Sequence, residues 1–155
     1  MIESAKKYMV DNTQALEKML ADLQPVFKAV NTLKAELLGI DTDNLPAIKD
    51  MSTKLSAYHG TLCEAFWFIH QLKENKQLAY YYSKKFEIEN KEPTPDEKGK
   101  LVKEKFVDGS TTQEARFYVA AERRVRDIIN GYKESVLERM RTCRNLVNEK
   151  KDKEV

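Results

Sequence analysis

The feature that most constrains this chain is a regular alternation of apolar side chains near its start. Side chains recur at spacings of three and four over about five heptads, with one polar member: Ile2, Ala5, Met9, Asn12, Leu16, Met19, Leu23, Val26, Val30, Leu33 and Leu37. This heptad spacing is typical of a helix that packs along its length against other helices. We therefore expect residues 1–38 to form one helix that ends before Gly39, since glycine commonly follows a helix.

We interpret this seam first as an oligomerisation surface and second as part of a closed core, so it packs either between chains or within one. The residues expected to carry it are Asn12, Leu16, Met19, Leu23, Val26, Val30, Leu33 and Leu37. Asn12 has two interpretations: a polar residue that fixes the register of the seam, or a member of a solvent-exposed first turn. Pro25 predicts a kink or a break just before it, and the continuation of the seam in phase favours a kink.

A second long helix is expected over residues 44–89. Asp43 or Asn44 can cap its start, and a proline follows in the first turn. Its apolar positions again recur at spacings of three and four, from Ile48 to Leu72. We place the centre of the core where three bulky side chains widen this stripe: Phe66, Trp67 and Phe68.

Two further helices are expected after a polar loop at residues 90–95. Thr94 to Glu97 resembles a capping box with proline in the first helical position, which predicts a short helix over residues 95–106. Thr111 to Glu114 is a second capping box and predicts the last long helix, over residues 111–149. The expected fold is all-α: one domain, residues 1–155, of long antiparallel amphipathic helices that form a helical bundle or a coiled-coil-like assembly.

Composition agrees with long exposed helices. Charged residues make up 34% of the chain and the formal net charge is only +2, so no overall field favours nucleic acid or a membrane surface. The most apolar stretch, Leu62 to Leu72, is far shorter than the roughly 20 residues that span a bilayer. The first residues are amphipathic and contain acids, unlike a signal peptide. We therefore expect a cytoplasmic protein without a membrane partner, whose Cys63 and Cys143 are reduced and buried on apolar helical positions.

No pattern of catalytic or metal-binding residues stands out. His59 and His70 lie about three helical turns apart, too far to share a metal ion within one chain. Cys63 has His59 one turn away on the same face, but no third group orients that pair. The glycines are scattered singly, so no phosphate-binding loop is present. We expect no enzymatic activity, no cofactor and no metal.

Aromatic and basic residues are interleaved in the second half of the chain. Rings beside cations are what proteins use to bind single-stranded nucleic acid, because rings stack on bases and cations pair with phosphates. Acidic residues alternate with these bases, so an ordinary solvated helix surface explains the same pattern. The candidate nucleic-acid-binding residues are Tyr81, Tyr82, Lys84, Lys85, Lys98, Lys100, Lys103, Lys105, Arg116, Arg123, Arg124 and Arg126.

The order of these parts resembles the UvsY-like recombination mediators, a family of small phage proteins. The likeness covers about residues 50–148. It consists of a long helix ending in tyrosines and lysines, a Lys-rich segment, a Val-Asp turn, and a last helix with a central tyrosine and a basic end. In this sequence these parts are Leu78 to Lys85, Lys98 to Lys105, Val107-Asp108, and Tyr132 to Arg144.

The resemblance implies a homo-oligomer of helices, in the form of a ring, that binds single-stranded DNA. Such a protein helps a recombinase to displace the single-strand-binding protein, in the host cytoplasm if the chain is phage-encoded. The DNA contacts that it implies are Lys84, Lys85, Lys98, Lys100, Lys103 and Lys105. The alternative is a phage-type protein-interaction module with no nucleic-acid role, either an inhibitor of a host defence enzyme or a coiled-coil adaptor.

Overall fold

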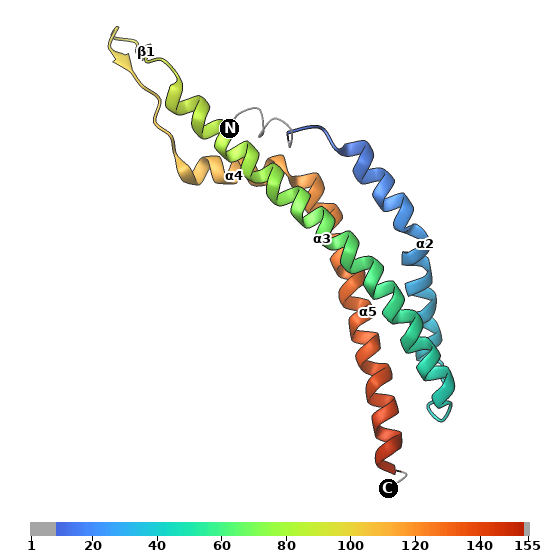
Figure 1. Cartoon of the computed structure of the whole chain (residues 1–155). Helices are drawn as coiled ribbons and strands as arrows, with labels where there is room; N and C mark the ends of the chain where they lie inside the picture. Colours follow the sequence, from blue (N-terminus) through green and yellow to red (C-terminus); the bar gives the residue numbers. More distant parts are fainter. Residues whose placement is uncertain (1–8, 154–155) are drawn as a thin grey trace.

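The chain folds into an elongated assembly of helices (Figure 1). The structure is a computed structural model that describes the backbone of residues 9–153 and the side chains of residues 9–150. Over this range the elements are α2 (Thr13–Leu38), α3 (Leu45–Asn90), β1 (Thr94–Pro95), β2 (Leu101–Val102), α4 (Asp108–Tyr118) and α5 (Ala120–Lys153). The predicted all-α fold is confirmed. No helix in this part of the chain is long and apolar enough to cross a membrane.

Helix α3 is the longest element and packs against each of the other three helices. α2 and α5 both run antiparallel to it, and α2 also packs on α5 (Figure 1). The three helices enclose the core with one apolar stripe each. The buried core residues are Leu16, Leu23, Phe27, Val30, Leu33, Ile48, Met51, Leu55, Leu62, Ile69, Val125, Ile129, Val136 and Cys143.

The apolar seam of α2 packs inside this single-chain core. Its buried members are Leu16, Leu23, Val30 and Leu33, and its half-buried members are Met19, Val26 and Leu37. Phe27, next to the seam, is also buried and stacks on Tyr132 of α5 with ring centroids 4.1 Å apart. The interpretation of the seam as first an oligomerisation surface is therefore wrong for these residues, because their apolar surface is used within one chain.

α2 begins at Thr13, so the described residues before it are not helical. Asn12 precedes the first turn, its side chain makes no capping hydrogen bond, and it does not fix the register of a helical seam. Instead the carboxylate of Asp11 accepts hydrogen bonds from the backbone N–H and the hydroxyl of Thr13, at 2.9 and 2.7 Å. The first two seam positions of the sequence lie outside the described residues. Pro25 is exposed and the helix continues through it, without a break.

α3 begins where the capping pattern predicted. The side-chain oxygen of Asn44 accepts a hydrogen bond from the Ala47 N–H at 3.1 Å, and Pro46 occupies the first turn. Asp43, the other candidate cap, instead forms an ion pair with Lys150 near the end of α5. The connection between α2 and α3 is therefore held both to α3 and to α5.

Replacing Asn44 with alanine is expected to lower the free energy of unfolding by about 1 kcal/mol, because the Ala47 N–H loses its acceptor. Urea denaturation followed by circular dichroism measures the change. The matched control is Thr42→Ala, an exposed residue of the same connection, which should change stability by less than about 0.5 kcal/mol. Equal losses in the two variants would contradict the capping role.

Two of the three aromatic residues that were expected to widen the core stripe lie outside the core. Trp67 and Phe68 are 59% and 64% exposed, and only Phe66 is half-buried. The fully buried residues in this region are Leu62 and Ile69. Successive residues on a helix are about 100° apart, so three bulky neighbours cannot all face the same core.

An antiparallel hairpin of β1 and β2 replaces the short helix predicted over residues 95–106. The carboxylate of Asp96 accepts hydrogen bonds from the backbone N–H groups of Lys98 and Lys100, at 2.9 and 2.8 Å. Gly99 adopts φ 77°, which glycine tolerates best. All residues from 91 to 105 are exposed. No buried face therefore stabilises a helix here, and the local turn bonds decide the structure.

The last helical segment begins earlier than predicted and is interrupted once. α4 begins at Asp108, and Thr111 lies inside it with its hydroxyl donating to the Val107 carbonyl at 3.1 Å. The second capping box was therefore a wrong prediction of the helix start. A break at Val119 separates α4 from α5. Both cysteines are free thiols, and burial raises the pKa of Cys143.

Candidate nucleic-acid interface

A buried ion pair fixes α3 against α5 beside the break at Val119. The Lys76 Nζ lies 2.5 Å from Oε1 of Glu122, and these side chains are only 9% and 1% exposed. The ammonium group also lies 5.1 Å from the ring centroid of Tyr118, on which Tyr80 stacks. A buried charge pair tolerates little displacement, because either charge alone would be desolvated without compensation. The pair therefore sets how α4 and α5 sit on α3.

Two surface hollows beside this break share Arg116 of α4 and Arg123 of α5. The first, of about 400 Å³, is lined by these arginines and by Gly109, Thr112, Gln113 and Phe117. The second, of about 350 Å³, is lined by the same arginines and by Lys73, Glu74, Gln77 and Val119. Both volumes fall within the range of small-ligand sites, roughly 300–1,000 Å³. We call them the arginine hollows.

The arginine hollows carry an excess of positive charge. Neither Arg116 nor Arg123 forms an ion pair with any residue that the structure describes. Lys73 pairs with Glu74, and its hydrogen bond lowers the pKa of that carboxyl, so Glu74 stays ionised at neutral pH. Three cations thus face one carboxylate in the second hollow, and the first is lined by two cations and no acid.

An exposed aromatic ring stands beside these charges. Phe117 is 67% exposed and lines the first hollow together with the amide of Gln113. A guanidinium group can bind a phosphate through two parallel hydrogen bonds, and an exposed ring can stack on a base. The arrangement therefore offers a base-stacking surface flanked by two phosphate-binding groups.

Two of the predicted residues of α3 are bound to acidic side chains. Tyr81 donates a hydrogen bond to Asp108, and this bond raises the pKa of the phenol. Lys84 Nζ lies 3.0 Å from a carboxylate oxygen of Glu87, which raises the pKa of the lysine. The pair with Glu87 thus neutralises the charge of Lys84, which was predicted to face nucleic acid.

Lys85 and Tyr82, also predicted, are less restrained. Lys85 Nζ lies 4.0 Å from a carboxylate oxygen of Glu89 and 5.6 Å from the ring centroid of Phe106. Tyr82 exposes 54% of its surface. On α5, Arg124 is exposed, whereas Arg126 binds the carboxylate of its neighbour at 2.6 Å.

The four predicted lysines of the hairpin segment form a separate exposed group. They form no ion pair with any described residue: Lys98, Lys100, Lys103 and Lys105. The hairpin projects beyond the helices at one end of the molecule (Figure 1). The arginine hollows lie on the helices themselves, so the structure separates the four hairpin lysines from Arg116 and Arg123.

Of the residues that line the arginine hollows, only Arg116 and Arg123 were predicted from the sequence. The residues not predicted are Lys73, Glu74, Gln77, Gly109, Thr112, Gln113, Phe117 and Val119. Thr112 and Gln113 lie about one turn before Arg116 on α4, so helical spacing could have included them. Lys73 has no comparable signal, because only the packing of α3 against the α4–α5 break brings it to the arginines.

No protein-family model, no curated protein and no solved structure matches this chain. The resemblance to the UvsY-like mediators stays a prediction from the residue pattern.

Proposed function

We propose that the protein binds single-stranded nucleic acid at the arginine hollows. The observation that carries the proposal is the placement of two arginines without ion-pair partners in the described chain beside the exposed ring of Phe117. Arg116 and Arg123 bind backbone phosphates, and Phe117 stacks on a base. Lys73 adds a third cation, and Gln113 supplies an amide for the edge of a base.

A single strand fits this site better than a duplex. Stacking on a side-chain ring requires a base whose face is free, which a single strand provides without the cost of unpairing. The formal net charge of only +2 provides no broad positive field for tracking a duplex. The affinity therefore depends on a local group of cations.

The biological role that we attach to this binding is that of a recombination accessory protein, on the resemblance to the UvsY-like mediators alone. Such a protein changes how readily a recombinase displaces a single-strand-binding protein from DNA. A displacement assay with labelled single-stranded DNA tests this role separately from binding itself.

Charge reversal of both arginines, Arg116→Glu with Arg123→Glu, is expected to weaken binding of a labelled single-stranded oligonucleotide by at least about tenfold at low salt. Attraction to two phosphates is replaced by repulsion. The slope of log affinity against log salt should also fall by about 0.7 for each phosphate that the variant no longer neutralises. Fluorescence anisotropy over a series of salt concentrations measures both quantities.

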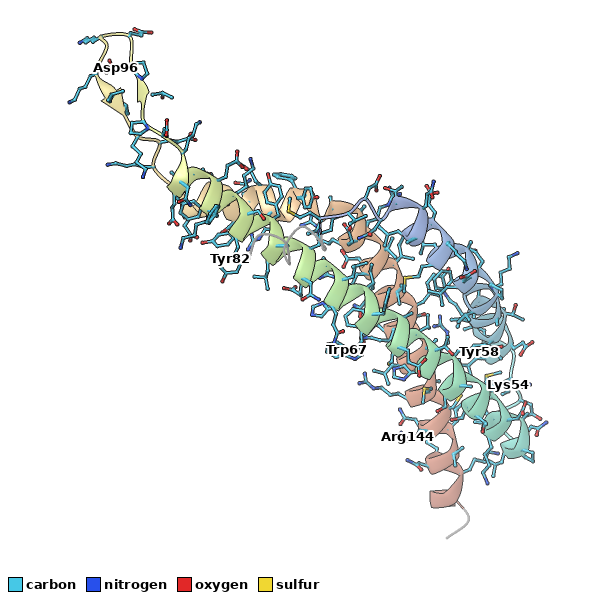
Figure 2. All side chains as sticks on the ribbon, turned by 45° about the horizontal axis from the view of Figure 1, so that its top comes forward. Lys54, Tyr58, Trp67, Tyr82, Asp96 and Arg144 are labelled. Atoms are coloured by element: carbon cyan, nitrogen blue, oxygen red, sulfur yellow. The ribbon has the colours of Figure 1, made fainter. Side chains whose placement is uncertain are left out.

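The matched control makes the same charge change elsewhere on α5, with Arg141→Glu and Arg144→Glu. Both residues are exposed, and Figure 2 shows Arg144 on the part of α5 farthest from the hairpin. This control should bind within about twofold of the unaltered protein, because screening limits charges more than about 10 Å apart. Equal weakening in both double variants would contradict the site, and no binding by the unaltered protein at low salt would refute the function.

A protein-interaction role is the second candidate, and the exposed aromatic residues of α3 favour it. Trp67 and Phe68 present large apolar surfaces that no described part of the chain covers. Such surfaces accept the apolar face of a partner helix. A pure interaction module would leave the oligonucleotide unbound, so the anisotropy experiment separates the two functions.

A further inference from the structure

One face of α3 carries large apolar side chains that lie open to solvent. At least half of the surface of each of five residues is exposed: Trp67, Phe68, Leu78, Tyr82 and Phe86. Figure 2 shows Trp67 and Tyr82 on the side of α3 that faces away from α2. Soluble proteins rarely expose contiguous apolar patches of more than a few hundred Å², unless the patch binds something.

Three of these residues belong to one narrow stripe along the helix. At about 100° per residue, six side chains between residues 64 and 85 fall within about 60° of one another around the axis of α3. Five of the six are exposed and Lys85 is half-buried. This α3 stripe consists of Glu64, Trp67, Gln71, Leu78, Tyr82 and Lys85. A stripe of this width suits packing against one further helix.

The α3 stripe is self-complementary when a second α3 is placed antiparallel to the first. Its midpoint lies between Glu74 and Asn75. Three pairs of its residues are equidistant from this point: Trp67 with Tyr82, Gln71 with Leu78, and Glu64 with Lys85. The first pair joins two aromatic rings and the third joins opposite charges.

We propose that a second copy of this chain docks antiparallel on the α3 stripe. Trp67 of each copy packs on Tyr82 of the other, and Glu64 of each copy faces Lys85 of the other. A twofold axis makes every contact occur twice. Glu64 forms no ion pair with any described residue, and the ion pair of Lys85 with Glu89 is long, at 4.0 Å.

The exposed apolar side chains of α3 supply part of the area that such a dimer needs. Large aromatic side chains bury roughly 150–250 Å² each, so the three half-exposed apolar residues of the α3 stripe offer roughly 300 Å² per copy, and the neighbouring Phe68 and Phe86 offer roughly 200 Å² more. A standard interface buries roughly 800 Å² per partner, and the polar members of the stripe supply the difference. This inference goes beyond nucleic-acid binding and moves self-association from the α2 seam to α3.

Light scattering of the unaltered protein, without an oligonucleotide, is expected to give twice the mass of the 18.0 kDa chain. Glu64→Lys places two lysine pairs face to face and should weaken dimerisation by at least about tenfold. Glu64→Lys combined with Lys85→Glu exchanges the two charges and should restore the dimer. The control is Glu17→Lys, the same change at an exposed position of α2, which should leave the mass doubled.

A single-chain mass for the unaltered protein at tens of micromolar would overturn the inference. So would a dimer that survives both Glu64→Lys and Leu78→Glu, the latter placing a charge near the centre of the stripe. Circular dichroism confirms that each variant remains folded. Oligonucleotide binding is measured on the same samples, so failure of dimerisation and failure of nucleic-acid binding are distinguished.

Discussion

Replacing Glu122 with alanine is expected to lower the free energy of unfolding by about 3–5 kcal/mol. The substitution leaves the ammonium group of Lys76, only 9% exposed, without the carboxylate that lies 2.5 Å away. The nearby ring of Tyr118 is only a partial substitute, because it carries no negative charge and a desolvated cation–π contact contributes roughly 2 kcal/mol or more. Urea denaturation followed by circular dichroism measures the loss.

Two controls test whether the lost stability comes from leaving one charge buried without a partner or from breaking an ion pair of any kind. Lys76→Met with Glu122→Leu removes both charges and should recover most of the lost stability, since apolar replacements of buried pairs are often neutral. Asp22→Ala breaks an exposed ion pair, in which Asp22 is 63% and Lys18 is 75% exposed. This variant should lose less than about 1 kcal/mol of the free energy of unfolding. If Glu122→Ala and Asp22→Ala had equal effects, the buried pair would have no special role.

Leu62→Ala is expected to cost about 3 kcal/mol, because Leu62 is fully buried in the core between the helices. The loss combines the transfer free energy of the removed methyl and methylene groups with the cavity left behind. Urea denaturation should show a lower midpoint with an unchanged dependence on urea concentration, since the surface exposed on unfolding is nearly the same.

The matched control is Leu38→Ala at the last residue of α2, where the side chain is 84% exposed. This variant should stay within about 0.5 kcal/mol of the unaltered protein. A large effect at Leu38 with none at Leu62 would show that the helices pack through other faces than those described.

The long helices could be predicted because their signals are local. Asn44 and the proline that follows it mark the start of α3, and the spacing of apolar residues continues for many turns. Gly39 likewise ends α2 as expected, with its N–H bonded to carbonyls of the last turn. In both cases the short-range chemistry agrees with the later packing.

The failures occurred where local signals compete with packing or with each other. Thr94 to Glu97 has the form of a helix cap, yet Asp96 forms a tight turn instead, since nothing buries a helix in that segment. Trp67 looked like core by its size, but the orientation of α3 is decided by the buried residues Leu62 and Ile69. The apolar character of a side chain alone does not determine whether the neighbouring helices bury it.

The candidate site could be predicted only in part. Arg116 and Arg123 were both among the predicted nucleic-acid-binding residues, and both line the arginine hollows. The residue pattern placed them in one group with the hairpin lysines, but the hairpin lies beyond the helices (Figure 1). Lys73 was not predicted, because contacts between distant segments depend on tertiary packing. The local residue pattern does not indicate such contacts.

The unbroken length of α3 has a consequence for anything that binds at both ends of the molecule. Its 46 residues span about 70 Å, at a rise of 1.5 Å per residue. α2 and α5 brace part of this span, and the ion pair of Asp43 with Lys150 ties its start to the last helix. The length of α3 thus fixes the separation between the hairpin at one end of the molecule and the α2–α3 connection at the other.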